Sequence, residues 1–158
     1  MIMNRLSNTE NIIFLTGGAL MVFGTALNFF EFYRLSPWLF LVGAIGFSTM
    51  QLRQVKGLGQ RMPGAPAGSN TVNITLRRLR TMMIIADVLF VVAGLMFVEN
   101  NWNFLMPLFG NFGMDGWVAY HQYVAHNNWI IVLLIAAILE LYSMHRISSE
   151  LNKDMKKM

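Results

Sequence analysis

Residues 53–80 read RQVKGLGQRMPGAPAGSNTVNITLRRLR, a basic stretch rich in glycine and proline that divides the chain in two. It holds six of the twelve Lys and Arg residues, and most of it keeps no apolar periodicity. We therefore expect an exposed linker over 54–80, whose last residues, LRRLR at 76–80, begin the next helix at a membrane interface. Two long apolar runs precede this linker and two follow it, and its positive charge predicts which way the chain lies in a membrane.

The apolar runs cover residues 12–32, 37–53, 81–98 and 128–146. At about 1.5 Å of rise per residue, a helix of about 20 residues crosses a hydrocarbon core of about 30 Å. Only 13% of the residues are charged, against about 25% in soluble domains, which favours a membrane environment. We predict an all-α fold with one domain over 1–158, an integral membrane four-helix bundle made of two tandem helical hairpins.

Capping residues indicate where several helices begin. Ser36 and Pro37 suit the N-cap and the first helical position of the second run. Asn127 or Asn128 fits the N-cap of the fourth run, and Asp115 fits that of a short helix over 117–126.

The cations predict the orientation of the bundle. Eleven of the twelve lie before the first run, between the second and third runs, or after the fourth, and only Arg34 lies at the opposite end. Lys and Arg accumulate on the cytoplasmic side of membrane proteins, so both termini and the linker are predicted to be cytoplasmic. All four tryptophans fall near the opposite boundary, where aromatic rings favour the headgroup layer: Trp38, Trp102, Trp117 and Trp129.

The two halves of the chain resemble each other weakly. LMVFGTAL at 20–27 is similar to LFVVAGLM at 89–96, and WLFLVGAIG at 38–46 is similar to WIIVLLIAA at 129–137. The pattern indicates either a parallel repeat of one hairpin or the shared composition of apolar helices.

Two passages carry a resemblance to a known group: RRLRTMMIIADVLF at 77–90 and NNWIIVLLIAAILELYSMHRISSEL at 127–151. Through these passages the chain resembles a group of small four-span inner-membrane proteins of Bacteroidetes, and the likeness covers most of its length. The resemblance implies the four-span topology in a bacterial inner membrane. It implies no activity and no functional residue.

Two acids lie inside the predicted spans. Asp87 is six residues past the start of the third span and Glu140 is six before Arg146, so both lie about 9 Å from the cytoplasmic boundary. Each shares a helix face with small residues, along which membrane helices approach each other, so both should point into the bundle. The pair could form a proton- or cation-coupled site, since two close carboxylates can share a proton. Alternatively, the acids form interhelical hydrogen bonds or ion pairs with Arg53, Arg80 or His145.

The segment 99–127 has no Lys or Arg and is rich in aromatic residues, so we expect it to fold over the helix ends at the outer membrane surface. Its candidates for chemistry are Asp115, His121 and His126. The two histidines are five residues apart, about 140° around a helix, which disfavours shared metal ligation. We predict no metal site and no cofactor.

Three functions fit these patterns. The first, which we favour, is a non-enzymatic structural, accessory or interaction module, within a homo-oligomer or a larger membrane complex. The second is a small proton- or cation-coupled transporter or channel that uses Asp87 and Glu140. The third is an enzyme acting on lipid through the outer histidines and Asp115. Membrane lipids are the expected partners, with anionic headgroups contacting Arg77, Arg78 and Arg80. Nucleic acid is not expected, because the positive residues only flank apolar runs.

Overall fold

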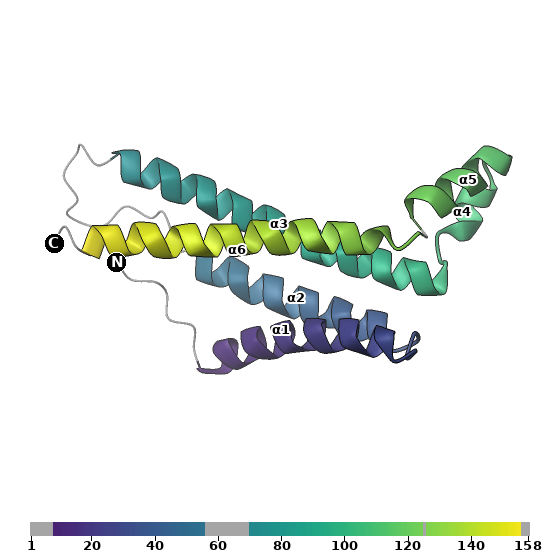
Figure 1. Cartoon of the computed structure of the whole chain (residues 1–158), viewed down its shortest axis with the longest axis horizontal. Coiled ribbons are helices and arrows are strands. Elements are labelled where there is room, and N and C mark those ends of the chain that lie inside the picture. The colour runs from purple at the N-terminus through teal and green to yellow at the C-terminus, as the bar shows by residue number, and fades with distance from the viewer. Residues whose placement is uncertain (1–7, 56–69, 125, 156–158) are drawn as a thin grey trace.

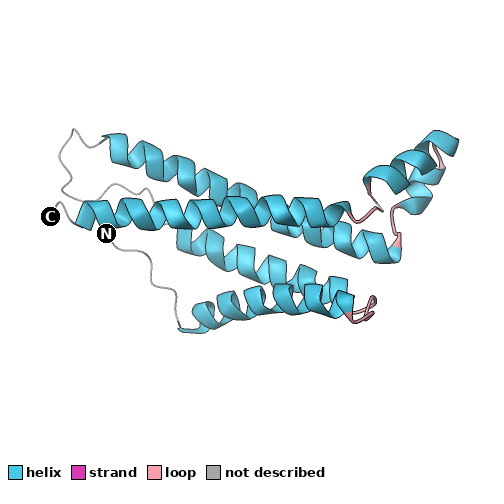
Figure 2. Ribbon diagram, in the orientation of Figure 1, coloured by secondary structure: helices cyan, strands magenta, loops and turns pink. Residues whose placement is uncertain are grey.

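A computed structural model of the chain describes residues 8–55, 70–124 and 126–155, and these residues are all-helical apart from short connections (Figure 2). The elements are α1 (Asn8–Phe29), α2 (Ser36–Val55), α3 (Asn70–Trp102), α4 (Met106–Gly110), α5 (Gly113–Tyr123) and α6 (Asn128–Met155). The all-α prediction is confirmed. The predicted linker residues 56–69 lie outside the described part of the chain. So does Ser7, which the S-x-x-E pattern at 7–10 predicts as the N-cap of the first helix.

Three of the described helices are long and apolar enough to cross a membrane: Asn8–Phe29, Arg77–Trp102 and Asn128–Ser149. They match the first, third and fourth predicted spans, as is typical of a membrane protein. The second predicted span corresponds to α2, which is not among them. Its apolar run is interrupted by Ser48, Gln51 and Arg53, and it begins with Ser36 and Pro37.

The third helix begins earlier than its apolar run. The structure starts α3 at Asn70, so the last eleven residues of the predicted linker are helical. No glycine or proline follows Gly68 until Gly94, and a formed helix extends readily through residues without helix breakers.

Between the first two helices, α1 ends at Phe29, and Glu31 turns the chain with a φ of 65°.

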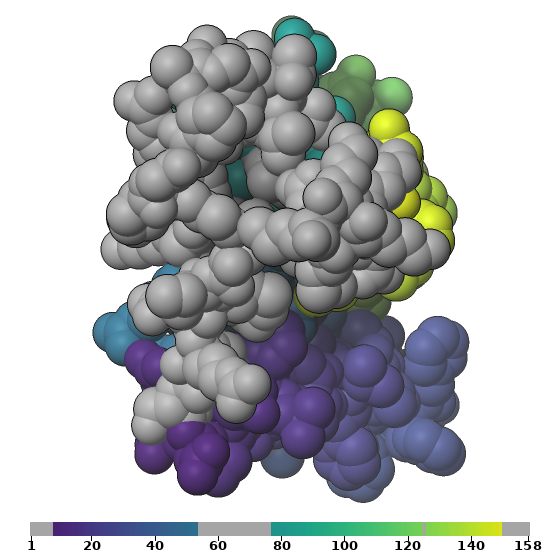
Figure 3. All heavy atoms as spheres, turned by 90° about the vertical axis from the view of Figure 1, so that its left-hand side faces the viewer, coloured from purple at the N-terminus to yellow at the C-terminus, as the bar shows by residue number. Residues whose placement is uncertain are grey.

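The long helices form two hairpins. Helix α1 packs along α2, α3 packs along α6, and α2 joins the hairpins by packing against α3 (Figure 1). One end of the bundle, where α2 ends and α3 begins, is called the linker end below; the other, which carries α4 and α5, is called the cap end. A view from the linker end shows α1, in purple, along one edge of the molecule (Figure 3).

Glycines allow α1 and α2 to pack backbone against backbone. A Cβ on Gly43 of α2 would lie 2.7 Å from the Gly17 carbonyl oxygen of α1. A Cβ on Gly24 would lie 2.7 Å from the backbone nitrogen of Phe40. The buried Ser36 hydroxyl uses this close approach and donates to the Gly24 carbonyl at 2.7 Å. The N-cap role predicted for Ser36 is therefore replaced by a bond between helices.

The core near the cap end is aromatic. The rings of Phe97 and Trp129 stack with their centroids 4.0 Å apart, and Phe40 meets both edge-on. Further toward the linker end the helices meet through fully buried alanines, Ala44, Ala93 and Ala136. Because alanine side chains are small, they take up little space between the helix backbones and allow the helices to pack closely.

The chain between α3 and α6 contains the short helices α4 and α5, which lie at the cap end of the bundle (Figure 1). The predicted helix over 117–126 is displaced, because α5 runs from Gly113 to Tyr123. Asp115 therefore lies in the first turn of α5 and does not cap it; Phe112 occupies the N-cap position. Asn128 begins α6, and its side-chain amide donates to the Gln122 and Tyr123 carbonyls at 2.9 and 3.0 Å.

Candidate functional site

Five polar side chains are buried together at one depth of the bundle. Asp87 comes from α3, Glu140 and Ser143 from α6, and Ser48 and Gln51 from α2, and each is at most 6% exposed. We call this set the polar layer. It holds both acids that the sequence singled out in the interior of the bundle.

Helical spacing explains how three helices supply one layer. Ser48 and Gln51 are three residues apart on α2, as are Glu140 and Ser143 on α6, so each pair faces one direction. Asp87 follows the fully buried Ala86 on α3. The layer is therefore assembled from the inward faces of α2, α3 and α6.

Apolar residues enclose the polar layer along the bundle axis. On the cap side, Phe90 lies one turn beyond Asp87, and the ring of Phe47 meets it edge-on at 6.0 Å. On the linker side, Leu79 and Met83 of α3 form a separate buried cluster with Ile147 of α6. The layer is thus a polar section within an otherwise apolar interior.

Two hydrogen bonds connect the polar layer across the helices. The Gln51 side-chain amide donates from Nε2 to Glu140 Oε1. The Ser48 hydroxyl donates to the backbone carbonyl of Asp87 at 3.2 Å. Both bonds start from α2, so this helix supplies the donors and the two other helices supply the acids.

Five buried oxygen atoms of the layer have no hydrogen-bond partner among the described residues. They are Gln51 Oε1, both carboxyl oxygens of Asp87, Glu140 Oε2 and the Ser143 hydroxyl oxygen. Leaving one buried polar group without a partner costs about 1–3 kcal/mol, and most buried polar groups in proteins are satisfied. Such a concentration of unpartnered oxygens is typical of a site that takes up a proton, a cation or water.

Two of the three cations proposed as partners of the acids lie elsewhere. Arg53 pairs with Glu10 of α1, with Nη1 and Oε1 3.0 Å apart. His145 is exposed. Neither carboxyl oxygen of Asp87 accepts a hydrogen bond from any cation that the structure describes. Of the two structural alternatives, the interhelical hydrogen bond is present, between Glu140 and Gln51.

Sequence reasoning missed the partners of the acids on α2. The sequence does mark Gln51 as a candidate, because it is an uncharged polar residue inside a predicted span, three residues from Ser48. Their position relative to Asp87 and Glu140 follows from the packing of α2 against α3, which one sequence does not reveal. Ser143 lies three residues after Glu140, so helical spacing alone places it on the same face of α6.

The outer candidates do not form a comparable site. Asp115, His121 and His126 are exposed, and the ring of His121 packs on Trp117 at 4.2 Å. Within the described ranges, no three His, Asp, Glu or Cys side chains come together as metal ligands. At the linker end, the lipid-contact candidates Arg77 and Arg78 are exposed and Arg80 is half-buried.

A second buried carboxylate fastens the cap to the bundle. Glu99, near the end of α3, accepts hydrogen bonds from the Tyr120 hydroxyl at 2.7 Å and the Leu105 backbone N–H at 2.8 Å. Both Glu99 and Tyr120 are buried. In contrast to Asp87, whose carboxyl oxygens have no partner among the described residues, Glu99 accepts two hydrogen bonds, so its role is to hold α5 against α3.

The Glu99–Tyr120 contact gives a testable pH dependence. Burial, the hydrogen bond to Glu99 and its negative charge raise the pKa of the Tyr120 phenol above 10. The folded state therefore favours the neutral phenol, and this stabilisation is complete below pH 10 and is lost as the pH rises further. In a spectrophotometric titration of tyrosine ionisation, Tyr120→Phe should remove the last transition, whereas Tyr123→Phe, at an exposed position, should leave that transition in place. Equal effects of the two variants would contradict the contact.

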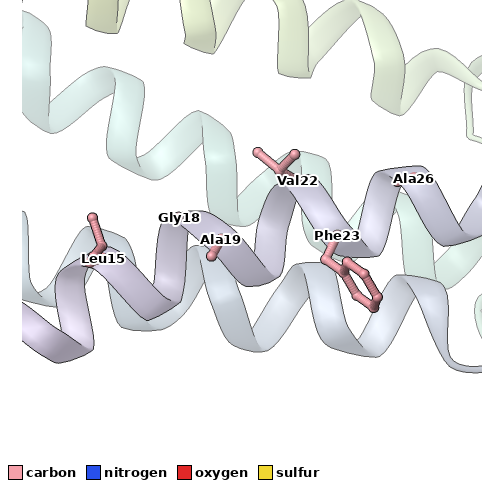
Figure 4. A pocket seen from close by; sticks show the side chains of 6 residues that line it. All are labelled: Leu15, Gly18, Ala19, Val22, Phe23 and Ala26. Carbon is pink, nitrogen blue, oxygen red and sulfur yellow. The ribbon is translucent and has the colours of Figure 1, made fainter.

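One further surface feature is a groove along α1. It is lined by Leu15, Gly18, Ala19, Val22, Phe23 and Ala26, and Figure 4 shows its side chains. All six residues are apolar, so the groove offers no group for catalysis or ion binding. It is a surface suited to lipid chains.

Comparison of the chain with protein-family models, curated proteins and solved structures gave no match.

Proposed function

We propose that α2 also crosses the membrane, which gives a four-span bundle in a bacterial inner membrane with both termini in the cytoplasm. Of the polar side chains that lower the hydropathy of α2, Ser36, Ser48 and Gln51 are buried, and Arg53 lies in its last turn. Its outward face carries apolar side chains such as Val42 and Ile45. A helix of this kind presents a lipid-compatible surface although its sequence contains polar residues. The distribution of Lys and Arg supports the orientation.

The topology can be tested with single cysteines, because the chain contains none. Arg34→Cys lies between α1 and α2, and Asn111→Cys lies between α4 and α5; both positions are exposed. Four spans place both on the periplasmic side, where a membrane-impermeant maleimide should label them in intact spheroplasts. Ser148→Cys is the control that should react only after lysis. If α2 did not cross, the first two positions would lie on opposite sides.

We further propose that the protein is a small proton- or cation-coupled transporter whose polar layer is the ion site. The observation that carries this proposal is the set of five unpartnered oxygens, with two carboxyl groups and no positive side chain bonded to them. Charged groups inside a membrane cost about 2.5–3.5 kcal/mol each on insertion scales and mark ion pathways or proton relays. A purely structural layer would be more stable with its oxygens satisfied or replaced by apolar groups.

The carboxyl groups provide the direct test. In proteoliposomes carrying an imposed pH gradient, the wild-type protein should speed the collapse of the gradient in NaCl or KCl, reported by an internal pH dye. Asp87→Asn and Glu140→Gln should each abolish the effect while the protein still folds. Glu10→Gln, which removes an acid in the first turn of α1 and leaves both interior acids in place, should still speed the collapse of the gradient. A wild-type protein as inactive as Asp87→Asn would contradict the transporter proposal.

The second candidate function is the non-enzymatic interaction module, and α1 is the observation that favours it. Only Gly17, Met21 and Gly24 of this helix are buried, so most of its apolar surface is uncovered in the single chain. Native mass spectrometry after gentle extraction would test this role. A second protein at fixed stoichiometry would support an accessory subunit, whereas the chain alone or a homo-oligomer would contradict that role.

A further inference from the structure

The polar layer contains two acids and no base. Facing it, α2 contributes the neutral Ser48 and Gln51, α3 contributes Asp87, and α6 contributes Glu140 and Ser143. Arg53 pairs with Glu10, and among the described residues no cation donates a hydrogen bond to either carboxyl oxygen of Asp87. The net charge of these five side chains is therefore determined by the protons and ions that they hold.

Charge balance limits which states of this layer are accessible in an apolar interior. An isolated charge is strongly disfavoured there, so states of zero net charge dominate. With both carboxyl groups protonated the layer is neutral. When one proton leaves, the remaining carboxylate needs one positive charge in the layer, which a single monovalent cation supplies.

The chemistry of the unpartnered atoms selects the type of cation. All five are oxygens, contributed by carboxyl, amide and hydroxyl groups, and oxygen ligands suit hard cations. A divalent ion would require both carboxyl groups to ionise at once. Mg²⁺ usually keeps several waters and Ca²⁺ takes 6–8 ligands, whereas the layer is enclosed by Phe90 on one side and Met83 on the other.

We propose that the polar layer exchanges one monovalent alkali cation for one proton, so that its net charge is zero in both occupied states. The O–H bond of one carboxylic acid, of Asp87 or Glu140, breaks and the proton leaves to water. The resulting carboxylate, Gln51 Oε1 and the Ser143 hydroxyl oxygen then bind the cation, and the reverse step releases it. This inference rests on the proposed function and adds the ion class and the stoichiometry.

Electroneutrality is the property to measure. In proteoliposomes with an imposed pH gradient, external Na⁺ or K⁺ should collapse the gradient, whereas choline should not. The rate should stay the same when the membrane potential is changed with a lipophilic cation gradient. Collapse in choline, or a rate that changes with the potential, would overturn the exchange and leave proton conduction. No collapse under any condition would instead contradict the proposed function itself.

A ligand variant separates this site from a nonspecific cation effect. Ser143→Ala removes one proposed cation ligand and keeps both acids, so the cation concentration for half-maximal exchange should rise about tenfold, with a smaller change in the maximal rate. Ser148→Ala, at an exposed position on the same helix, is the matched control and should change neither. Equal cation dependence of the two variants would overturn the assignment of Ser143, and faster exchange with Ca²⁺ than with Na⁺ would overturn the monovalent class.

Discussion

Gly43→Leu is expected to separate α1 from α2 and to lower the free energy of unfolding by about 3 kcal/mol. A Cβ at this position would lie 2.7 Å from the Gly17 carbonyl oxygen and 2.8 Å from the Met21 backbone nitrogen. Both are backbone atoms of α1, so no rotamer change can relieve the overlap, and α1 must move away as a unit. The substitution therefore disrupts the contact between α1 and α2 that holds the first hairpin together.

Gly46→Leu provides the matched control, because a Cβ there meets nothing within 4 Å. Both variants gain the same helix propensity, up to about 1 kcal/mol, so their difference reports packing alone. The measurement is unfolding by SDS titration in mixed micelles, followed by circular dichroism. Gly46→Leu should unfold at the wild-type SDS fraction or higher and Gly43→Leu well below it. Equal midpoints would show that α1 does not pack on α2 through this glycine.

The helices and their interior acids were predictable, because each depends on local information. Length and hydropathy identify the first, third and fourth apolar helices, and the small residues beside Asp87 and Glu140 indicate which helix faces are buried. The pairing of helices was less accessible. Ser36 has the residue type and position of an N-cap, yet it bonds to Gly24 of another helix. Asp115 likewise has the residue type of a cap but lies inside α5.

The chemistry of the site depended on contacts that join distant parts of the chain. Gln51 and Glu140 are 89 residues apart, and their hydrogen bond exists because α2 packs against the second hairpin. Hydropathy alone treats Gln51 as a residue that weakens a span. Within the packed bundle, the same side chain supplies a donor to Glu140 and an unpartnered oxygen to the polar layer.

The double variant Asp87→Asn/Glu140→Gln is expected to be more stable than the wild type by about 2 kcal/mol at neutral pH. An interior acid must either take up a proton or bear a charge that costs about 2.5–3.5 kcal/mol on insertion scales, whereas the two amides are neutral. Both substitutions keep the shape of the side chain. The amide of residue 140 can still accept the hydrogen bond from Gln51 Nε2. The comparison therefore isolates the cost of keeping two acids in the interior, and it should be made by SDS titration at neutral pH in choline buffer, where no alkali cation can stabilise the wild type.

Gln51→Leu should change the stability of the protein in the opposite direction, through the same layer. It keeps both acids and removes the only donor that the structure gives Glu140, so stability should fall by about 1–3 kcal/mol. A site selected for ion exchange keeps acids that weaken the fold, so neutralising them stabilises the protein and ends transport. A layer selected for structure behaves differently: the double variant would then lose stability as Gln51→Leu does, and the acids would be interhelical hydrogen-bond acceptors with no role in transport.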